Sequence, residues 1–197
     1  MTTSALAMII VFYAHDYIGL WTGQQEIASA ISSTAVLLTL GSMFLSLQLC
    51  PYYLALANGH TRTNVLMGAG SIVAIVPLLW FLIPAYGLLG AAIPWLVINI
   101  TATLLLGVII IRKYLKNEFF AWLLKDSFLP VAVSFAVGLP LYFVFGFLPA
   151  GAMSVVYGAV IASAAVAVNG YLFVRKYPEM LSNRIVSKIV KKTGIRL

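Results

Sequence analysis

Residues 87–111 read GLLGAAIPWLVINITATLLLGVIII and contain no charged side chain, and residues 112–116, RKYLK, follow with three basic ones. An α-helix rises 1.5 Å per residue, so this run would reach about 38 Å, enough to cross the hydrocarbon core of a bilayer, about 30 Å thick. Basic residues are typical of the end of a spanning helix, where they meet lipid headgroups. The stretch therefore predicts a transmembrane helix that ends near Arg112.

The rest of the chain has the same character. Of its 197 residues, 62% are hydrophobic and 9% are charged, whereas soluble domains carry about 25% charged residues. A water-soluble protein needs a polar coat that this composition cannot supply. We therefore expect an all-α, polytopic transmembrane helix bundle.

Turn and charge signals divide the chain into apolar segments, which predict six spans. The second segment is too long to cross upright and should tilt or bend near Pro51. The first is short, and we expect it to be the end of a helix whose beginning is missing. The bundle would occupy residues 1–175 and a basic amphipathic tail residues 176–197. The predicted spans are residues 5–20, 28–57, 64–83, 87–111, 128–147 and 152–174.

Lysine and arginine predict the orientation of the chain. All 12 of them fall in the connections at residues 58–63 and 112–127 or after the last predicted span, from Arg175 onward, that is, in alternate connections. Cytoplasmic connections collect these residues, so both termini should lie on the cytoplasmic side of the cell membrane. The net charge of +7 is then expected to meet anionic lipid headgroups, without any nucleic acid. The tail would rest on the membrane surface as a helix, or else extend into solvent.

Groups that carry enzyme chemistry are scarce. The five acidic residues lie near helix ends or in connections, and they form no paired carboxylates and no aspartate-rich motif. His15 and His60 are expected near opposite faces of the membrane, too far apart for a shared metal site. The glycines form no phosphate-binding loop. We therefore expect no enzyme activity, no metal and no cofactor.

Two groups of polar residues within the spans are candidates for function. His15 and Asp16 form an ionisable pair close to the outer mouth, either a site that responds to a proton or substrate, or an ordinary helix end at headgroup level. Hydroxyl side chains of the second segment fall within about 140° on a helical wheel. They would line a hydrated path for substrate or support close helix packing, and Asn99 and Thr103 share a face with the same two interpretations. The hydroxyl candidates are Ser32, Thr39, Ser42 and Ser46, whereas Gln48 lies on another side of its helix.

Three local patterns resemble one family. They are LWTG at residues 20–23, ALANGHTR at residues 55–62 and IPAYGLLGAA at residues 83–92. Their order and spacing resemble the C-terminal half of Wzx-like polysaccharide flippases, in the multidrug/oligosaccharidyl-lipid/polysaccharide (MOP) exporter superfamily, over roughly residues 1–175. The resemblance implies one half of a MOP- or MATE-like transporter, which carries lipid-linked oligosaccharide, typically on undecaprenyl diphosphate, to the outer leaflet.

The resemblance also has consequences for the site and for partners. Such transporters have two helix bundles around a central cavity, so the other bundle would come from a missing N-terminal half or from a partner chain. The cationic groups expected around a diphosphate would come from there too, because no lysine or arginine lies deep in a span here. Asn58 and Arg62, in the second pattern, would make a gating or headgroup contact, unless Arg62 only directs topology.

Several functions fit these expectations. The first is part of a flippase that exports lipid-linked oligosaccharide by alternating access. The alternatives are a multidrug or small-molecule antiporter of the same superfamily and a membrane assembly subunit that transports nothing alone. A membrane-bound transferase comes last, because the reactive groups it needs are absent from the sequence.

Overall fold

The computed structural model describes residues 2–116, 118–145 and 153–176. The predicted tail beyond Lys176 and the connection around residues 148–151 lie outside the described residues. Within the described ranges, every regular element is a helix, and six continuous helical stretches are long and apolar enough to cross a membrane. The prediction of an all-α, six-span bundle is confirmed.

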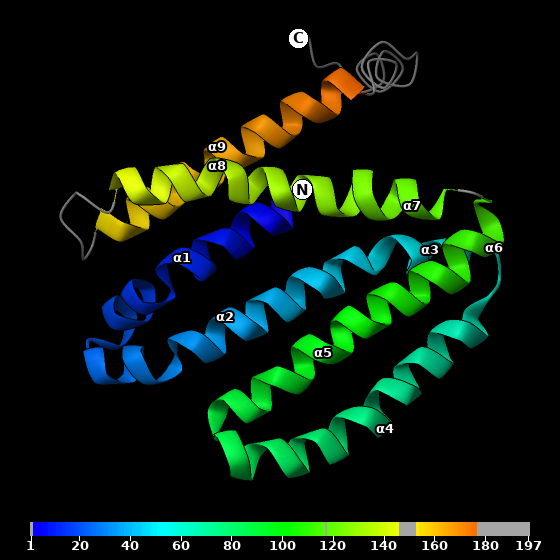
Figure 1. The fold of residues 1–197 in the computed structure, drawn as a ribbon, viewed down its shortest axis with the longest axis horizontal. Helices are drawn as coiled ribbons and strands as arrows, with labels where there is room; N and C mark the ends of the chain where they lie inside the picture. Colours follow the sequence, from blue (N-terminus) through cyan, green and yellow to red (C-terminus); the bar gives the residue numbers. More distant parts are fainter. Residues whose placement is uncertain (1, 117, 146–152, 177–197) are drawn as a thin grey trace, which may run out of the picture.

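The helices follow the apolar segments along the chain (Figure 1). The first span is α1 (Thr2–Thr22), and the second combines α2 (Gln25–Leu47) with α3 (Leu49–Ala57). The third is α4 (Thr61–Tyr86), and the fourth joins α5 (Leu88–Leu106), the π-helix η1 (Gly107–Ile111) and α6 (Arg112–Tyr114). The fifth joins α7 (Phe119–Ala121), the π-helix η2 (Trp122–Phe128) and α8 (Leu129–Phe145), and α9 (Met153–Lys176) is the sixth.

Two of the spans are irregular. Pro51 has no N–H and cannot bond the carbonyl of Leu47, so the second span is interrupted at Gln48, between α2 and α3. In the first span, Tyr13 has φ −122° and ψ 17°, which kinks α1. The residues after this kink, His15 among them, therefore follow a different direction from the start of the helix.

The fifth span begins earlier than the hydropathy pattern predicts, because the expected connection at residues 112–127 is largely helical. Phe119 and Trp122 are buried against Ile111 at the end of the fourth span. The Arg112 guanidinium lies 5.0 Å from the centre of the Phe119 ring, within range of a cation–π attraction. With these contacts, the helix of the fifth span already includes the charged residues Lys125 and Asp126.

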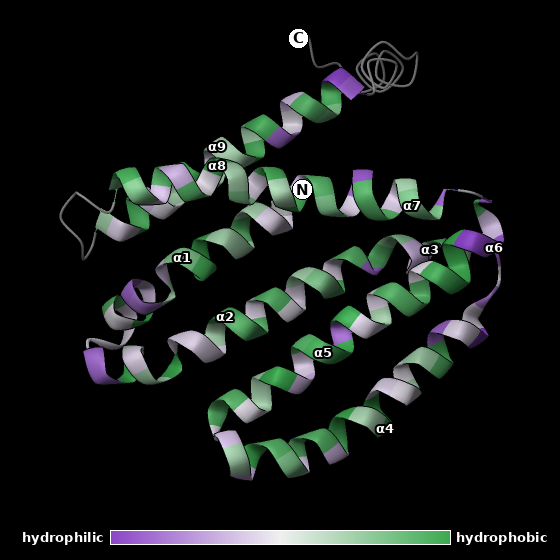
Figure 2. Cartoon of the chain, viewed as in Figure 1, coloured by the Kyte–Doolittle hydropathy of each residue, from purple (hydrophilic) through white to green (hydrophobic). Residues whose placement is uncertain are grey.

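The spans lie side by side in a layer, in the order α4, α5, α2, α1 and then the pair α8 and α9 (Figure 1). At one edge, α4 packs mainly against α5 and has no buried residue. Figure 2 shows hydrophobic residues along all the spans, with most of the hydrophilic colour near helix ends and a hydrophilic turn within α5. Because successive spans run in opposite directions, Arg62, Arg112, Lys125 and Lys176 lie toward the same end of the layer.

Candidate functional site

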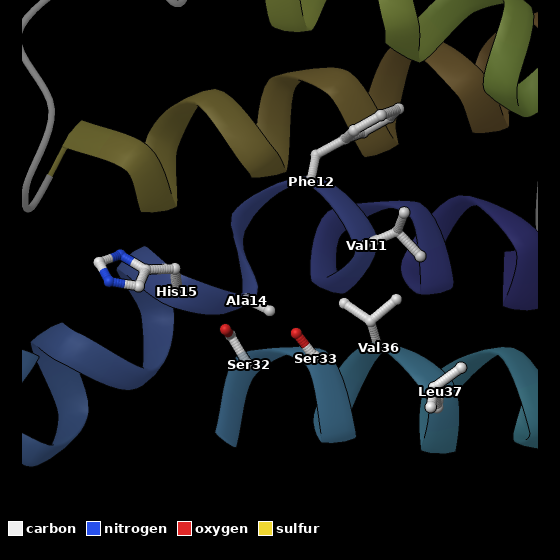
Figure 3. Close-up of a pocket in the computed structure, with 8 residues that line it drawn as sticks. All are labelled: Val11, Phe12, Ala14, His15, Ser32, Ser33, Val36 and Leu37. Atoms are coloured by element: carbon white, nitrogen blue, oxygen red, sulfur yellow. The ribbon is translucent and has the colours of Figure 1, made fainter. Parts of the chain in front are cut away.

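A first cavity lies between α1 and α2, near the kink in α1 (Figure 3). Its volume is about 420 Å³. Most of its lining is apolar, but His15 of α1 and Ser32 and Ser33 of α2 contribute polar groups. The structure thus brings together His15 and Ser32, which the sequence singled out separately. The lining residues are Val11, Phe12, Ala14, His15, Ser32, Ser33, Val36 and Leu37.

The predicted pair His15 and Asp16 joins α1 to both of its neighbours. His15 Nε2 lies 3.3 Å from Ser29 Oγ of α2, and Ser154 Oγ of α9 donates a hydrogen bond of 2.8 Å to Asp16 Oδ2. His15 Nδ1 and Asp16 Oδ1 are 3.6 Å apart. The pair therefore links α1 to α2 through His15 and to α9 through Asp16.

Tyr17 adds a second link between α1 and α9. Its hydroxyl donates a hydrogen bond of 3.2 Å to the backbone carbonyl of Val155. Gly158 makes room for this ring, because a Cβ there would lie 2.6 Å from the Tyr17 hydroxyl oxygen. The part of α1 after the kink is therefore held on one side by α2 and on the other by α9.

A second cavity, of about 360 Å³, lies among the second span, α4 and α5. We call it the amide groove, because three side-chain amides line it. The described residues that line it carry no charge. It is thus a neutral, partly polar site within the apolar spans. The polar residues of its lining are Gln48, Tyr52, Asn64, Ser71 and Asn99.

Gln48 and Asn99 connect the two walls of the amide groove. Gln48 Nε2 donates to the Asn99 backbone carbonyl (3.1 Å) and to Asn99 Oδ1 (3.2 Å), while Asn99 Nδ2 donates to the carbonyl of Trp95 (2.8 Å). Thr103 Oγ1 lies 3.0 Å from the carbonyl of Phe44 on α2. Both Asn99 and Thr103 are buried. Their polar groups hold α5 against α2, and the Asn99 side chain also borders the groove.

Asn64 leaves one buried acceptor unsatisfied in the same groove. Its Nδ2 donates a hydrogen bond of 3.2 Å to the carbonyl of Tyr52. Its Oδ1 is shielded from solvent and has no hydrogen-bond partner among the described residues. Buried polar atoms without partners are rare in folded proteins and costly. The Asn64 amide must turn toward the groove before the hydrogen-bond donor of a ligand can reach this acceptor.

The predicted arc of hydroxyl residues does not meet the Asn99 and Thr103 pair. Ser46 Oγ donates to Thr3 Oγ1 of α1 (3.2 Å), and Ser32 lines the cavity beside α1. Ser42 is exposed and donates to the carbonyl of Leu38 in its own helix (2.9 Å). The half-buried Thr39 completes the arc. The two sets of candidates lie on different sides of α2, and Gln48, which faces α5, was the side chain that sequence reasoning left unexplained.

Asn58 and Arg62 lie in and just after the connection between α3 and α4. Asn58 Nδ2 donates a hydrogen bond of 2.8 Å to the carbonyl of Leu54 and so caps α3. Arg62 is exposed in the first turn of α4. In the same connection, the ring of His60 lies 3.3 Å from Lys113 Nζ. The gating or headgroup role of Asn58 and Arg62 stays a prediction.

Among the described residues, no three His, Cys, Asp or Glu side chains lie close enough together to hold a metal ion.

The chain matches no protein-family model, and no solved structure matches it. A stretch of 103 residues is 32% identical to a Shigella flexneri protein described as a "Putative O-antigen transporter". The match covers 51% of this chain and 24% of that protein, so the matched stretch spans about a quarter of its relative's length.

Proposed function

We propose that this chain is part of a membrane transport protein that exports lipid-linked oligosaccharide across the cytoplasmic membrane. The observation that carries the proposal is its similarity to the O-antigen transporter, found in a chain whose apolar helices can span a membrane six times. The three sequence patterns that resemble polysaccharide flippases support the same activity. Transport of this kind requires a fold that crosses the membrane several times, and six apolar helices are long enough to do so.

The physical problem for such a protein is to carry a hydrophilic saccharide through hydrocarbon. Polar groups that leave water without new hydrogen bonds cost several kcal/mol each, roughly 4–8 for transfer to a hydrocarbon. Side-chain amides and hydroxyls within the spans can replace the hydrogen bonds to water. The amide groove and the cavity beside His15 supply such groups between helices.

Transport would proceed by alternating access, through rigid-body rocking of one helix bundle against another. The second bundle would come from a further part of the same protein or from a partner chain. In this mechanism, His15 and Asp16 lie at the outer mouth, and Asn58 and Arg62 contact headgroups at the cytoplasmic end. The basic residues at that end attract anionic lipid headgroups and the diphosphate of the substrate.

Deletion of the complete reading frame that contains this chain tests the proposal. We expect lipid-linked oligosaccharide to accumulate in the inner leaflet and the surface glycan to be lost, because the saccharide cannot cross the bilayer unaided. Sidedness is measured by the access of a membrane-impermeant lectin in intact and in inverted vesicles. Re-expression from a plasmid is the control and should restore the surface glycan.

Two results would count against this function. Normal surface glycan after deletion, in a strain without a second exporter, contradicts it. Loss of resistance to toxic small molecules with unchanged glycan would instead favour the small-molecule antiporter. The same deletion strain therefore separates the two kinds of transporter.

A further inference from the structure

The amide groove has the chemistry of a saccharide site. Its three amides offer donors and acceptors at fixed positions, and the aromatic residues Tyr52 and Trp95 line the same space. Asn64 Oδ1 is a buried acceptor that still lacks a donor. A sugar hydroxyl is a donor of the right kind, and the apolar faces of a sugar ring can pack against aromatic rings. The volume of about 360 Å³ falls within the range of small-ligand pockets, about 300–1,000 Å³.

The absence of charge on the described lining residues of the amide groove favours a sugar over a phosphate as its ligand. None of the described residues that line the amide groove is charged, so a phosphate there would be buried without a counter-ion, which is costly. Basic side chains occur instead at the end of the same helices. His60 and Lys113 lie together there, and Lys113 follows the groove residue Leu106 by about two helical turns, roughly 10 Å.

We propose that the amide groove binds the first sugar of the lipid-linked saccharide while its diphosphate stays at the basic end, beside Lys113 and His60. This inference rests on the proposed function and assigns a location to its substrate. The lipid remains in the inner leaflet, with the diphosphate at headgroup level. The neutral sugar reaches into the groove toward Gln48 and Asn99, and one of its hydroxyls donates to Asn64 Oδ1 after that amide turns toward the groove.

Two glycines of α4 allow the groove to be filled selectively. A Cβ on Gly68 or on Gly70 would meet no atom within 4 Å. Gly68 lines the amide groove, whereas Gly70 lines a neighbouring apolar cleft between α4 and α5. Phenylalanine at position 68 would fill the sugar site, and phenylalanine at position 70 would fill only the cleft. Because both positions are open, both variants should fold, and they form a matched pair.

The experiment uses the protein from the complete reading frame, reconstituted in proteoliposomes. The probe is a short polyprenyl diphosphate linked to N-acetylglucosamine that carries a photoreactive diazirine on the sugar. A second probe carries the diazirine on the lipid chain and has no sugar. After irradiation, mass spectrometry of the digested protein identifies labelled residues. Labelling by the sugar probe is expected within the amide groove, and the sugar-free probe should not label it.

The variants provide the quantitative prediction. Gly68→Phe should lower labelling of the groove by at least about tenfold, the change that 1.4 kcal/mol produces, whereas Gly70→Phe should stay within about twofold of the unmodified protein. Asn64→Leu removes one hydrogen bond and should lower labelling by about fivefold. Equal labelling by the sugar-free probe, or unchanged labelling in Gly68→Phe, would overturn the inference.

Failure of the inference can be told from failure of the proposed function, because labelling does not require transport. Normal glycan export by the Gly68→Phe variant, without labelling of the groove in any variant, refutes the sugar site and leaves the export function standing. Labelling of the groove in a protein whose deletion leaves surface glycan normal refutes export and leaves a saccharide-binding site.

Discussion

At the scale of single residues, the part of α1 after the kink depends on a few polar contacts. Asp16 accepts a hydrogen bond from Ser154, which is 1% exposed, and His15 contacts Ser29. Among apolar helices there are few other directional contacts to fix the position of this segment. Asp16 is therefore the residue whose loss should be most visible in the stability of the outer end.

We predict that Asp16→Ala lowers the free energy of unfolding in detergent by about 1–2 kcal/mol, since a hydrogen bond to a charged group contributes about 1.5–3 and Asp16 is partly exposed. Asp16→Asn keeps an acceptor oxygen for Ser154 and should lose less than half as much. Thermal unfolding followed by circular dichroism measures both variants. An alanine variant as stable as the unmodified protein, or an asparagine variant that is no better than alanine, would refute the link to α9.

The sequence predicted His15 and Asp16 as a candidate pair but not their partners. Ser154 is 138 positions from Asp16, so the contact depends on how α9 packs against α1. Gln48 is a similar case. Its side chain meets Asn99, 51 positions away, because α2 and α5 pack with a particular register. Local spacing identifies residues of one helix face but carries no information on which helix covers that face.

At the scale of helices, α4 and α5 form a hairpin with very close backbones near the turn. Gly87 adopts φ 56° at the turn, a conformation that glycine tolerates best. Gly90 faces α4 so closely that a Cβ would collide with the backbone carbonyl of Leu82. A backbone carbonyl cannot rotate away as a side chain could. The hairpin therefore requires glycine at position 90.

We predict that Gly90→Ala destabilises the protein by about 1–3 kcal/mol, the usual cost of overpacking. Gly170→Ala in α9 is the matched control, because a Cβ there meets no atom within 4 Å. Alanine is the better helix former, so the control should be neutral or slightly stabilising. Thermal unfolding in detergent compares the two. Equal stability of both variants would show that the helices are less closely packed at position 90.

The hydropathy pattern predicted the number of helices, but it did not predict every helix boundary. Long apolar runs predicted six spans because an unpaired backbone N–H or C=O group in hydrocarbon is costly. Within a single segment, only a helix forms hydrogen bonds to all of these groups. Pro51 correctly marked an interruption, since its missing N–H is a local property. The early start of the fifth span was missed because Lys125 and Asp126 resemble a connection. Packing of Phe119 and Trp122 against Ile111 outweighs that local signal.

At the scale of the whole molecule, the alternating direction of six spans gathers the basic connections at one end of the layer. Glu26, in the first turn of α2, belongs to the opposite end. The positive-inside rule then predicts that the basic end faces the cytoplasm. The proposed loading of a saccharide from the inner leaflet depends on this orientation, because the amide groove leads toward that same end.

Sidedness of single cysteines tests this arrangement most directly. In a Cys50→Ser background, Thr22→Cys and Lys116→Cys place one thiol at each end of the bundle. A membrane-impermeant maleimide applied to intact cells should label the variant at position 22, and it should label the variant at position 116 only after the membrane is opened. Labelling of both from the same side, or of position 116 from outside, would contradict the six-span orientation and the transport account built on it.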